Sequence, residues 1–101
     1  MTLQLRTYQL DPARAGEFVT WWSATMPALR QRFGMQIPFA YLDENSGLFV
    51  WGVEVEGDRE AFLAVEKAYN DSPERKALKP PDAAIVRSVS AGFARVATPP
   101  D

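Results

Sequence analysis

The eight residues from Leu48 to Val55 constrain the fold of this chain more than any other segment. They are rich in aromatic and β-branched side chains, which favour a β-strand. Alternate side chains of a strand point to opposite faces, and here both faces are apolar: Phe49, Trp51, Val53 and Val55 on one, Leu48 and Val50 on the other. Such a strand is typical of a sheet that is buried on both sides. The chain has only 101 residues, so we expect a second copy to cover one side.

The patterns on either side of this strand predict the order β-α-β-β-α-β of a ferredoxin-like α+β domain. Residues 3–10 alternate between apolar and polar positions, residues 35–43 carry alternate large apolar side chains, and residues 84–96 form the last apolar stretch. We therefore expect a four-stranded antiparallel sheet that pairs with a second copy as a dimeric α-β barrel. A single domain is expected over residues 1–97, followed by a frayed tail over residues 98–101.

A long helix is predicted after the first strand, with Asp11 as its N-cap and Pro12 in its first turn. Pro27 has no backbone N–H, so we expect a kink or a break there. Gly34 is a typical C-terminal stop. The predicted apolar stripe of this helix consists of Ala15, Phe18, Trp22, Met26, Leu29 and Phe33.

Turn and capping residues mark the remaining boundaries. Residues 43–47 (Asp-Glu-Asn-Ser-Gly) predict a hairpin, and Pro38 predicts an edge position or a bulge in the strand before it. Asp58 is the expected cap of a second helix, and residues 72–74 (Ser-Pro-Glu) predict the start of a short third one. Gly92 is a plausible bulge in the last strand.

Composition excludes several kinds of chemistry. The chain has no cysteine and no histidine, so thiolate nucleophiles, thiolate metal sites, histidine bases and axial histidine ligands are all ruled out. Its net charge is −2 and its cations form no dense basic stripe, so nucleic acid is not an expected partner. We find no phosphate-binding glycine loop, and no apolar run long enough to enter a membrane. A cytoplasmic protein without a cofactor is the expectation.

Three features together resemble the NIPSNAP family of the dimeric α-β barrel superfamily. They are Leu5-Arg6-Thr7-Tyr8, the long helix with Trp22 and Pro27, and Tyr69 followed by Ser72-Pro73-Glu74. The resemblance spans residues 3–96 and departs at Arg75, where such proteins often have an aromatic residue. It implies two chains closing a barrel, with a cavity between sheet and helices in each. It implies no particular reaction, since the superfamily includes cofactor-free oxygenases, isomerases and ligand-sensing modules.

Arg6 and Tyr8 share one face of the first strand and are candidate ligand-binding residues. An arginine supplies paired donors and a tyrosine an orienting hydroxyl, which suits an anion or carbonyl clamp. The alternative is that Arg6 pairs with a carboxylate such as Glu54 while Tyr8 packs at an interface. Glu54 interrupts an apolar strand, so it is a candidate base if it faces a partly buried space. Otherwise Glu54 is a solvated residue at the strand end.

A second group of candidates is aromatic or apolar. Trp22, Met26, Tyr41 and Trp51, with Trp21 and Phe93, could line a pocket for an aromatic or acyl ligand. The alternative is that these side chains are ordinary core. Two hypotheses follow. In the first, the chain is a homodimeric barrel that binds a small apolar ligand and, if it is an enzyme, has cofactor-free oxygenase-like or isomerase-like chemistry. In the second, it is a non-catalytic interaction or sensing module without a small-molecule substrate.

Overall fold

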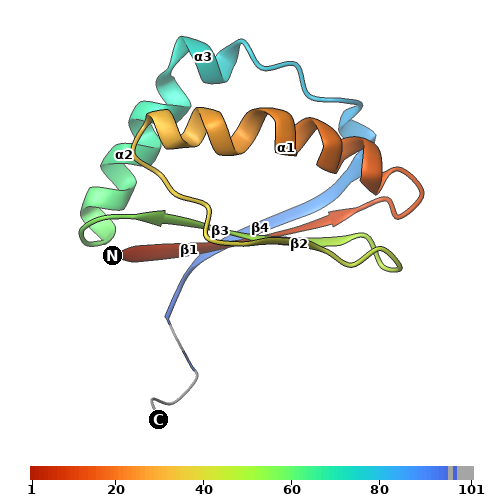
Figure 1. Cartoon of the computed structure of the whole chain (residues 1–101), viewed down its shortest axis with the longest axis horizontal. Coiled ribbons are helices and arrows are strands. Elements are labelled where there is room, and N and C mark those ends of the chain that lie inside the picture. Colours follow the sequence, from red (N-terminus) through yellow and green to blue (C-terminus); the bar gives the residue numbers. More distant parts are fainter. Residues whose placement is uncertain (96, 98–101) are drawn as a thin grey trace.

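The computed structural model describes residues 1–95 and residue 97 as one layer of helices over one layer of sheet (Figure 1). The sheet has four antiparallel strands in the order β2-β3-β1-β4, as a ferredoxin-like fold requires. The strands are β1 (Thr2–Leu10), β2 (Ala40–Leu42), β3 (Leu48–Val55) and β4 (Val86–Ala94), and the helices are α1 (Ala15–Arg32), α2 (Arg59–Asp71) and α3 (Pro73–Lys76). The predicted fold class and order of elements are therefore confirmed.

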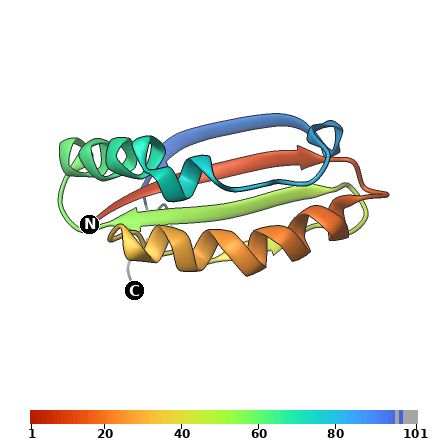
Figure 2. The ribbon, with the colours of Figure 1, turned by 90° about the horizontal axis from the view of Figure 1, so that it is seen from above.

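All the helices lie on one side of the sheet, which leaves the other side open. Seen from above, α1 runs beside β3 and over β2, while α2 lies toward the β4 side (Figure 2). The strand register decides which residues meet each layer. Arg6 of β1 pairs with Trp51 of β3 and with Ala91 of β4, and these three positions share the face toward the helices. We call the opposite side of the sheet the open face.

Helix α1 begins later than predicted. Residues 12–14 form a turn, in which the Asp11 carboxylate accepts a hydrogen bond from Ala13 N–H at 3.0 Å, and the helix itself starts at Ala15. Asp11 therefore caps the turn and not the helix. Of the kink or break predicted at Pro27, the break is wrong, because the helix continues through this residue to Arg32. The neighbouring turns and the tertiary packing of the apolar stripe hold the helix together there.

Strand β2 is much shorter than the predicted residues 35–43. Between Met35 and Phe39 the chain is extended but is held to β3 mainly by the Gln36–Glu54 bridge, with hydrogen bonds of 2.9 and 2.8 Å. Pro38 cannot donate to the ladder, which explains why regular pairing begins only at Ala40. The predicted edge position is correct, and so is the hairpin that joins β2 to β3.

The predicted caps of the later helices are present. Asp58 accepts from Ala61 N–H at 2.9 Å at the start of α2, and Ser72 accepts from Arg75 N–H at 3.1 Å at the start of α3. A 3-10 turn (Ala83–Ile85) precedes β4, so that strand starts two residues later than predicted. The bulge expected at Gly92 is wrong: the register with β1 is regular there and shifts instead beside Leu10. Val96 and the predicted tail lie outside the described residues.

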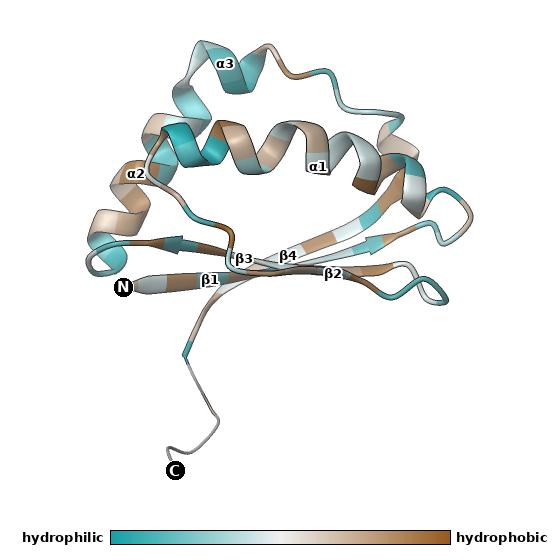
Figure 3. Ribbon diagram, in the orientation of Figure 1, coloured by the Kyte–Doolittle hydropathy of each residue, from teal (hydrophilic) through white to brown (hydrophobic). Residues whose placement is uncertain are grey.

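The core fills the space between the two layers. It joins the α1 stripe to the helix-facing side of β3 and to single residues of the other elements, and hydropathy colouring shows apolar segments on both layers (Figure 3). Phe49 and Trp51 are each 1% exposed, and Trp22 packs edge-on against both rings at 5.0 and 5.1 Å. Among the described helices, none is both long and apolar enough to cross a bilayer.

Candidate functional site

The interior between sheet and helices contains polar groups as well as core. Strand β1 turns its polar positions inward, so Gln4, Arg6 and Tyr8 point toward the helices. Gln4 is buried, and Arg6 and Tyr8 are half-buried. An inward polar face is unusual for a central strand, since a core-facing position normally carries an apolar side chain. This face of β1 is the starting point of the candidate site.

Two guanidinium groups approach Trp51 from different elements. Arg6 comes from β1 and lies 5.2 Å from the centre of the Trp51 ring, and Arg30 comes from the last turn of α1 and lies 5.0 Å from it. Arg30 also lies 4.5 Å from the centre of the Tyr69 ring on α2. With Trp22, whose ring packs on Trp51, these residues form what we call the arginine–tryptophan cluster: Arg6, Trp22, Arg30 and Trp51.

The arginine–tryptophan cluster has more hydrogen-bond donors than acceptors. Arg6 donates to the side-chain oxygen of Gln4 at 2.9 Å and to the Tyr8 hydroxyl at 3.1 Å. Arg30 donates to the sulfur of Met35 at 3.4 Å, which is a weak acceptor. Four buried N–H groups have no acceptor among the described residues: Nε of Arg6, Nε of Arg30, and the indole nitrogens of Trp22 and Trp51. Buried donors without partners are rare in folded proteins.

Positive charge in the cluster is also in excess of negative charge. Arg30 is 5% exposed, and burial lowers the pKa of its guanidinium, with the nearby Arg6 lowering it further. The ion pairs within residues 1–95 belong to other cations, namely Arg14, Lys67 and Arg87, all on the surface. The carboxylate of Glu66 on α2 favours the charged form of Arg30, although no ion pair joins the two side chains among the described residues. The cluster therefore combines positive charge with unused donors.

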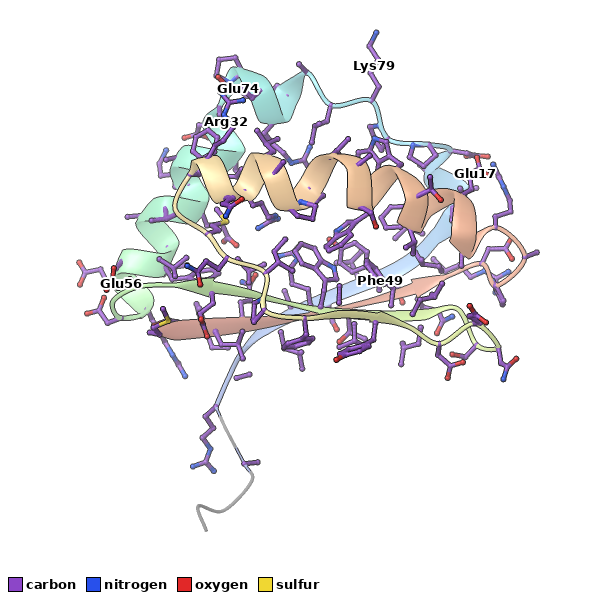
Figure 4. The ribbon with its side chains drawn as sticks, in the orientation of Figure 1. Glu17, Arg32, Phe49, Glu56, Glu74 and Lys79 are labelled. Atoms are coloured by element: carbon purple, nitrogen blue, oxygen red, sulfur yellow. The ribbon has the colours of Figure 1, made fainter. Side chains whose placement is uncertain are left out.

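A cavity of about 310 Å³ adjoins the cluster. It lies between the second half of α1 and the extended segment that leads to β2, and its walls are Pro27, Gln31, Met35, Gln36, Ile37 and Pro38. Met35 connects the two features, because it lines the cavity and also accepts the hydrogen bond from Arg30. The volume is at the lower end of the range for small-molecule sites. Side chains fill the rest of the interlayer space, with Phe49 among them (Figure 4).

The structure brings together five of the seven residues predicted for the site. Arg6, Tyr8 and Trp51 touch one another, Trp22 packs on Trp51, and Met26 accepts a hydrogen bond from the Tyr69 hydroxyl at 3.2 Å. Trp21 and Phe93 lie at the edges of the same interior. The core alternative also holds in part, because Trp22, Met26 and Trp51 are all less than 9% exposed.

The other two predicted residues lie on the open face. Glu54 pairs with Leu3, and Tyr41 pairs with Val50, so both side chains point away from Arg6 and the helices. Glu54 is half-buried and Tyr41 is 71% exposed. Neither lies beside the arginine–tryptophan cluster. An ion pair between Arg6 and Glu54, the alternative considered for Arg6, does not form because the sheet separates them.

Sequence reasoning missed Arg30, the most buried charge of the cluster. It follows Met26 by four residues, so it belongs to the same apolar stripe of α1. A cation at a stripe position was the available signal. Tyr69 entered the sequence analysis only through the family resemblance, yet its ring centre lies 4.5 Å from the guanidinium of Arg30 and 6.0 Å from that of Arg75. Arg75, which stands where similar proteins often have an aromatic residue, thus still contacts an aromatic ring.

Exposed apolar side chains lie on the open face. Leu5 is 36% and Leu48 37% exposed, and the rings of Phe39 and Tyr41 stack at 6.2 Å with an angle of 21°. Gly52 makes room for this surface, because a Cβ there would stand 2.8 Å from the Phe39 ring. Among the described residues, no three carboxylates lie close enough together to hold a metal ion.

Comparison with known proteins shows which solved structures share this fold. No family profile matches the sequence, and no curated protein matches it. Among solved structures, an uncharacterised NIPSNAP domain protein from Burkholderia xenovorans matches with a TM-score of 0.81 and 15% identity over 100% of both chains. A NIPSNAP family protein of unknown function from Agrobacterium tumefaciens matches with a TM-score of 0.80 and 9% identity, over 93% of this chain and 86% of the other. An antibiotic biosynthesis monooxygenase matches with a TM-score of 0.69 and 14% identity over 97% and 100%.

At these identities the likeness concerns the fold and not the activity. It extends over nearly the whole chain and includes the long helix and the segment after α2 on which the sequence resemblance depended. The resemblance predicted from the sequence is therefore confirmed at the level of structure, and the chain has the fold of NIPSNAP proteins.

Proposed function

We propose that this chain binds a small apolar or aromatic ligand in the interior between its sheet and its helices. The observation that carries the proposal is the set of four buried N–H donors without acceptors, next to a cavity of about 310 Å³. A buried donor without an acceptor carries an uncompensated desolvation cost. A ligand that enters past Met35 and Ile37 would contact these apolar side chains, with the amides of Gln31 and Gln36 also in the wall, and would bring acceptors to the donors.

We also propose that the open face pairs with the same face of a second copy, which gives a homodimeric α-β barrel. The face exposes Leu5, Tyr41 and Leu48 in an otherwise small domain. Burying such a surface is favourable at about 25 cal/mol per Å² of apolar area, and a two-fold pairing needs only one self-complementary patch. The sequence predicted a cover for the third strand on the same ground, because that strand is apolar on both of its faces. The expected compartment of the protein is still the cytoplasm.

We assign binding and not catalysis. The candidate base Glu54 lies on the open face, and the inward groups near the cluster are arginines, tyrosines and an amide. One structural neighbour is an antibiotic biosynthesis monooxygenase, but the low identity leaves that chemistry as a property of the neighbour. The alternative function is a non-catalytic interaction module, in which the aromatic side chains are only core.

A native mass spectrum of the freshly purified protein tests ligand binding. We expect the mass of two chains plus a small molecule that is lost on denaturation. A two-chain mass without an addition, together with no tryptophan fluorescence change across a panel of small aromatic ligands, would favour the interaction module instead. Trp22 and Trp51, two of the three tryptophans of the chain, lie in the proposed site and make fluorescence sensitive to a ligand there.

The dimer is tested by a matched pair of variants. Leu5→Glu adds a charge to the open face, whereas Leu63→Glu adds the same charge to an exposed position of α2, where the leucine is 53% exposed. We expect Leu5→Glu to sediment as a folded monomer, and Leu63→Glu and the unmodified chain as dimers. A dimer that survives Leu5→Glu, with unchanged circular dichroism, would move the interface elsewhere.

A further inference from the structure

The arginine–tryptophan cluster, which rests on the ligand-binding function proposed above, also restricts what the ligand can be. Its two cations lie close to one ring: Arg6 at 5.2 Å and Arg30 at 5.0 Å from the centre of Trp51. Arg30 is 5% exposed. Within residues 1–95 neither guanidinium forms an ion pair, although other arginines of the chain do so at the surface. Charges this deep are normally paired or bound to a counter-ion.

The unused hydrogen-bonding groups all have the same polarity. The four buried polar atoms without partners are donors, and two of them belong to the guanidiniums themselves. Among the described side chains, Gln4 and Tyr8 accept from Arg6 and the sulfur of Met35 accepts from Arg30, while the carboxylate of Glu66 on α2 forms no ion pair with either guanidinium. A ligand that complements this cluster must therefore supply acceptors and negative charge. A carboxylate supplies both, with two oxygens that a guanidinium can bind in parallel.

The position of the cavity explains how such a group would reach Arg30. Met35 forms part of the cavity wall and is also the present partner of Arg30, at a length of 3.4 Å. A thioether is a weak and flexible acceptor, so a carboxylate entering from the cavity can take its place on the guanidinium. Ile37 and Pro38 form the outer wall and suit an apolar body behind the charged group.

We infer that the ligand is a small organic carboxylate with an apolar or aromatic body, whose anionic group binds Arg30 and Arg6 at the Trp51 ring. The competing explanation is that Arg30 is a structural side chain, held by Tyr69 and Trp51 through cation–π contacts of 4.5 and 5.0 Å. Those contacts account for the position of the guanidinium. They leave its Nε–H without an acceptor, and they leave Arg6 unpaired as well.

The test compares carboxylic acids with their own primary amides, which have almost the same shape and no charge. The probes are benzoate, 3-phenylpropionate, indole-3-acetate and hexanoate, each measured beside its amide by calorimetry at pH 7 and low salt. We expect at least one acid to bind ten-fold or more tightly than its amide. Equal affinity within every pair, or no binding by any acid, would overturn the anionic assignment. Amides that bind as well as acids would leave the proposed ligand-binding function standing.

Two variants separate a binding role from a structural one. Arg30→Met removes the buried cation, and Arg32→Met removes an exposed cation two residues away on the same helix. We expect Arg30→Met to lose the preference for acid over amide while its melting temperature in the absence of ligand is unchanged or raised. Arg32→Met should keep the preference. A melting temperature lowered by Arg30→Met, with the preference retained, would make Arg30 structural.

Arg6→Met provides a second route if Arg30→Met fails to fold. Arg6 is only half-buried, so its replacement disturbs the core less, and it comes from β1 and not from α1. We expect the acid-over-amide preference to fall at least five-fold in Arg6→Met. An unchanged preference in Arg6→Met would remove β1 from the anion site and refute the two-arginine arrangement.

Discussion

Gly47 closes the β2–β3 hairpin against the end of β1, and its replacement by alanine should be the most destabilising glycine substitution in the chain. Its φ is +78°, a conformation that disfavours any side chain. An added Cβ would overlap the carbonyl oxygen of Leu10 and approach the nitrogen of Pro12 to 3.2 Å. These are backbone atoms, so no side chain can rotate to relieve the contact.

The expected loss in the free energy of unfolding has three parts. The left-handed conformation costs an alanine about 1–2 kcal/mol. Relieving the overlap must separate the strands where Leu10 N–H donates to the Gly47 carbonyl at 2.9 Å, which forfeits about 1 kcal/mol. Leu10 is 0% exposed, so its displacement also disturbs the core. The sum is about 3 kcal/mol, or roughly 2 M in the midpoint of a urea transition.

Two other glycines serve as controls. Gly34 has a φ of +88° with nothing near its missing Cβ, so Gly34→Ala should cost only the conformational part, about 1 kcal/mol. Gly16 lies in α1 with free space around it, and Gly16→Ala should stabilise by about 0.5 kcal/mol. Urea unfolding followed by tryptophan fluorescence, at one fixed protein concentration, measures all three. If Gly47→Ala costs no more than Gly34→Ala, the backbone overlap is not real.

Three further predictions concern a helix cap, a surface ion pair and the open face. Asp58→Ala removes the acceptor for Ala61 N–H at 2.9 Å and should cost about 1 kcal/mol in urea unfolding; a cost near zero would mean that water replaces the cap. The hydrogen bond from Arg14 lowers the pKa of Asp82 below 3.8, so its stabilisation is present above that pH and is lost as pH falls through the lowered value. Asp82→Asn should therefore lower the melting temperature at pH 7, and the difference from the unmodified chain should shrink below pH 4; a constant difference would contradict the ion pair. Gly52→Ala forces the Phe39 ring aside and should cost about 1 kcal/mol while weakening the dimer in sedimentation; unchanged association would exclude that part of the open face.

Most of the fold could be predicted because periodicity and capping depend on neighbouring residues. The limits of β3, the caps at Asp58 and Ser72 and the order of all the strands follow from such local patterns. The errors arose where tertiary contacts override local preference. Pro27 remains inside α1 because the stripe on either side is anchored in the core, and the strand expected from Met35 shrinks because Pro38 offers no donor.

The candidate site could be predicted only in part, for a related reason. Alternation along β1 identified Arg6 and Tyr8 as partners on one face, but no local pattern says which face of a strand meets the helices. Glu54 and Tyr41 were assigned to the site by residue type, and the register then put them on the other face. Arg30 comes from a different element, and its approach to Trp51 depends on how α1 lies on the sheet.

The extended segment before β2 has a consequence for how fast the interior exchanges with solvent. It forms one wall of the cavity, yet beyond Met35 it is tied to the sheet mainly by two hydrogen bonds between Gln36 and Glu54 and one from Gly52 to Phe39. A segment held this weakly opens at a lower free energy than the paired strands beside it. Amide hydrogen exchange should therefore be faster at Gln36 than at Val53. The residence time of a bound ligand would be set by this local opening and not by unfolding of the domain.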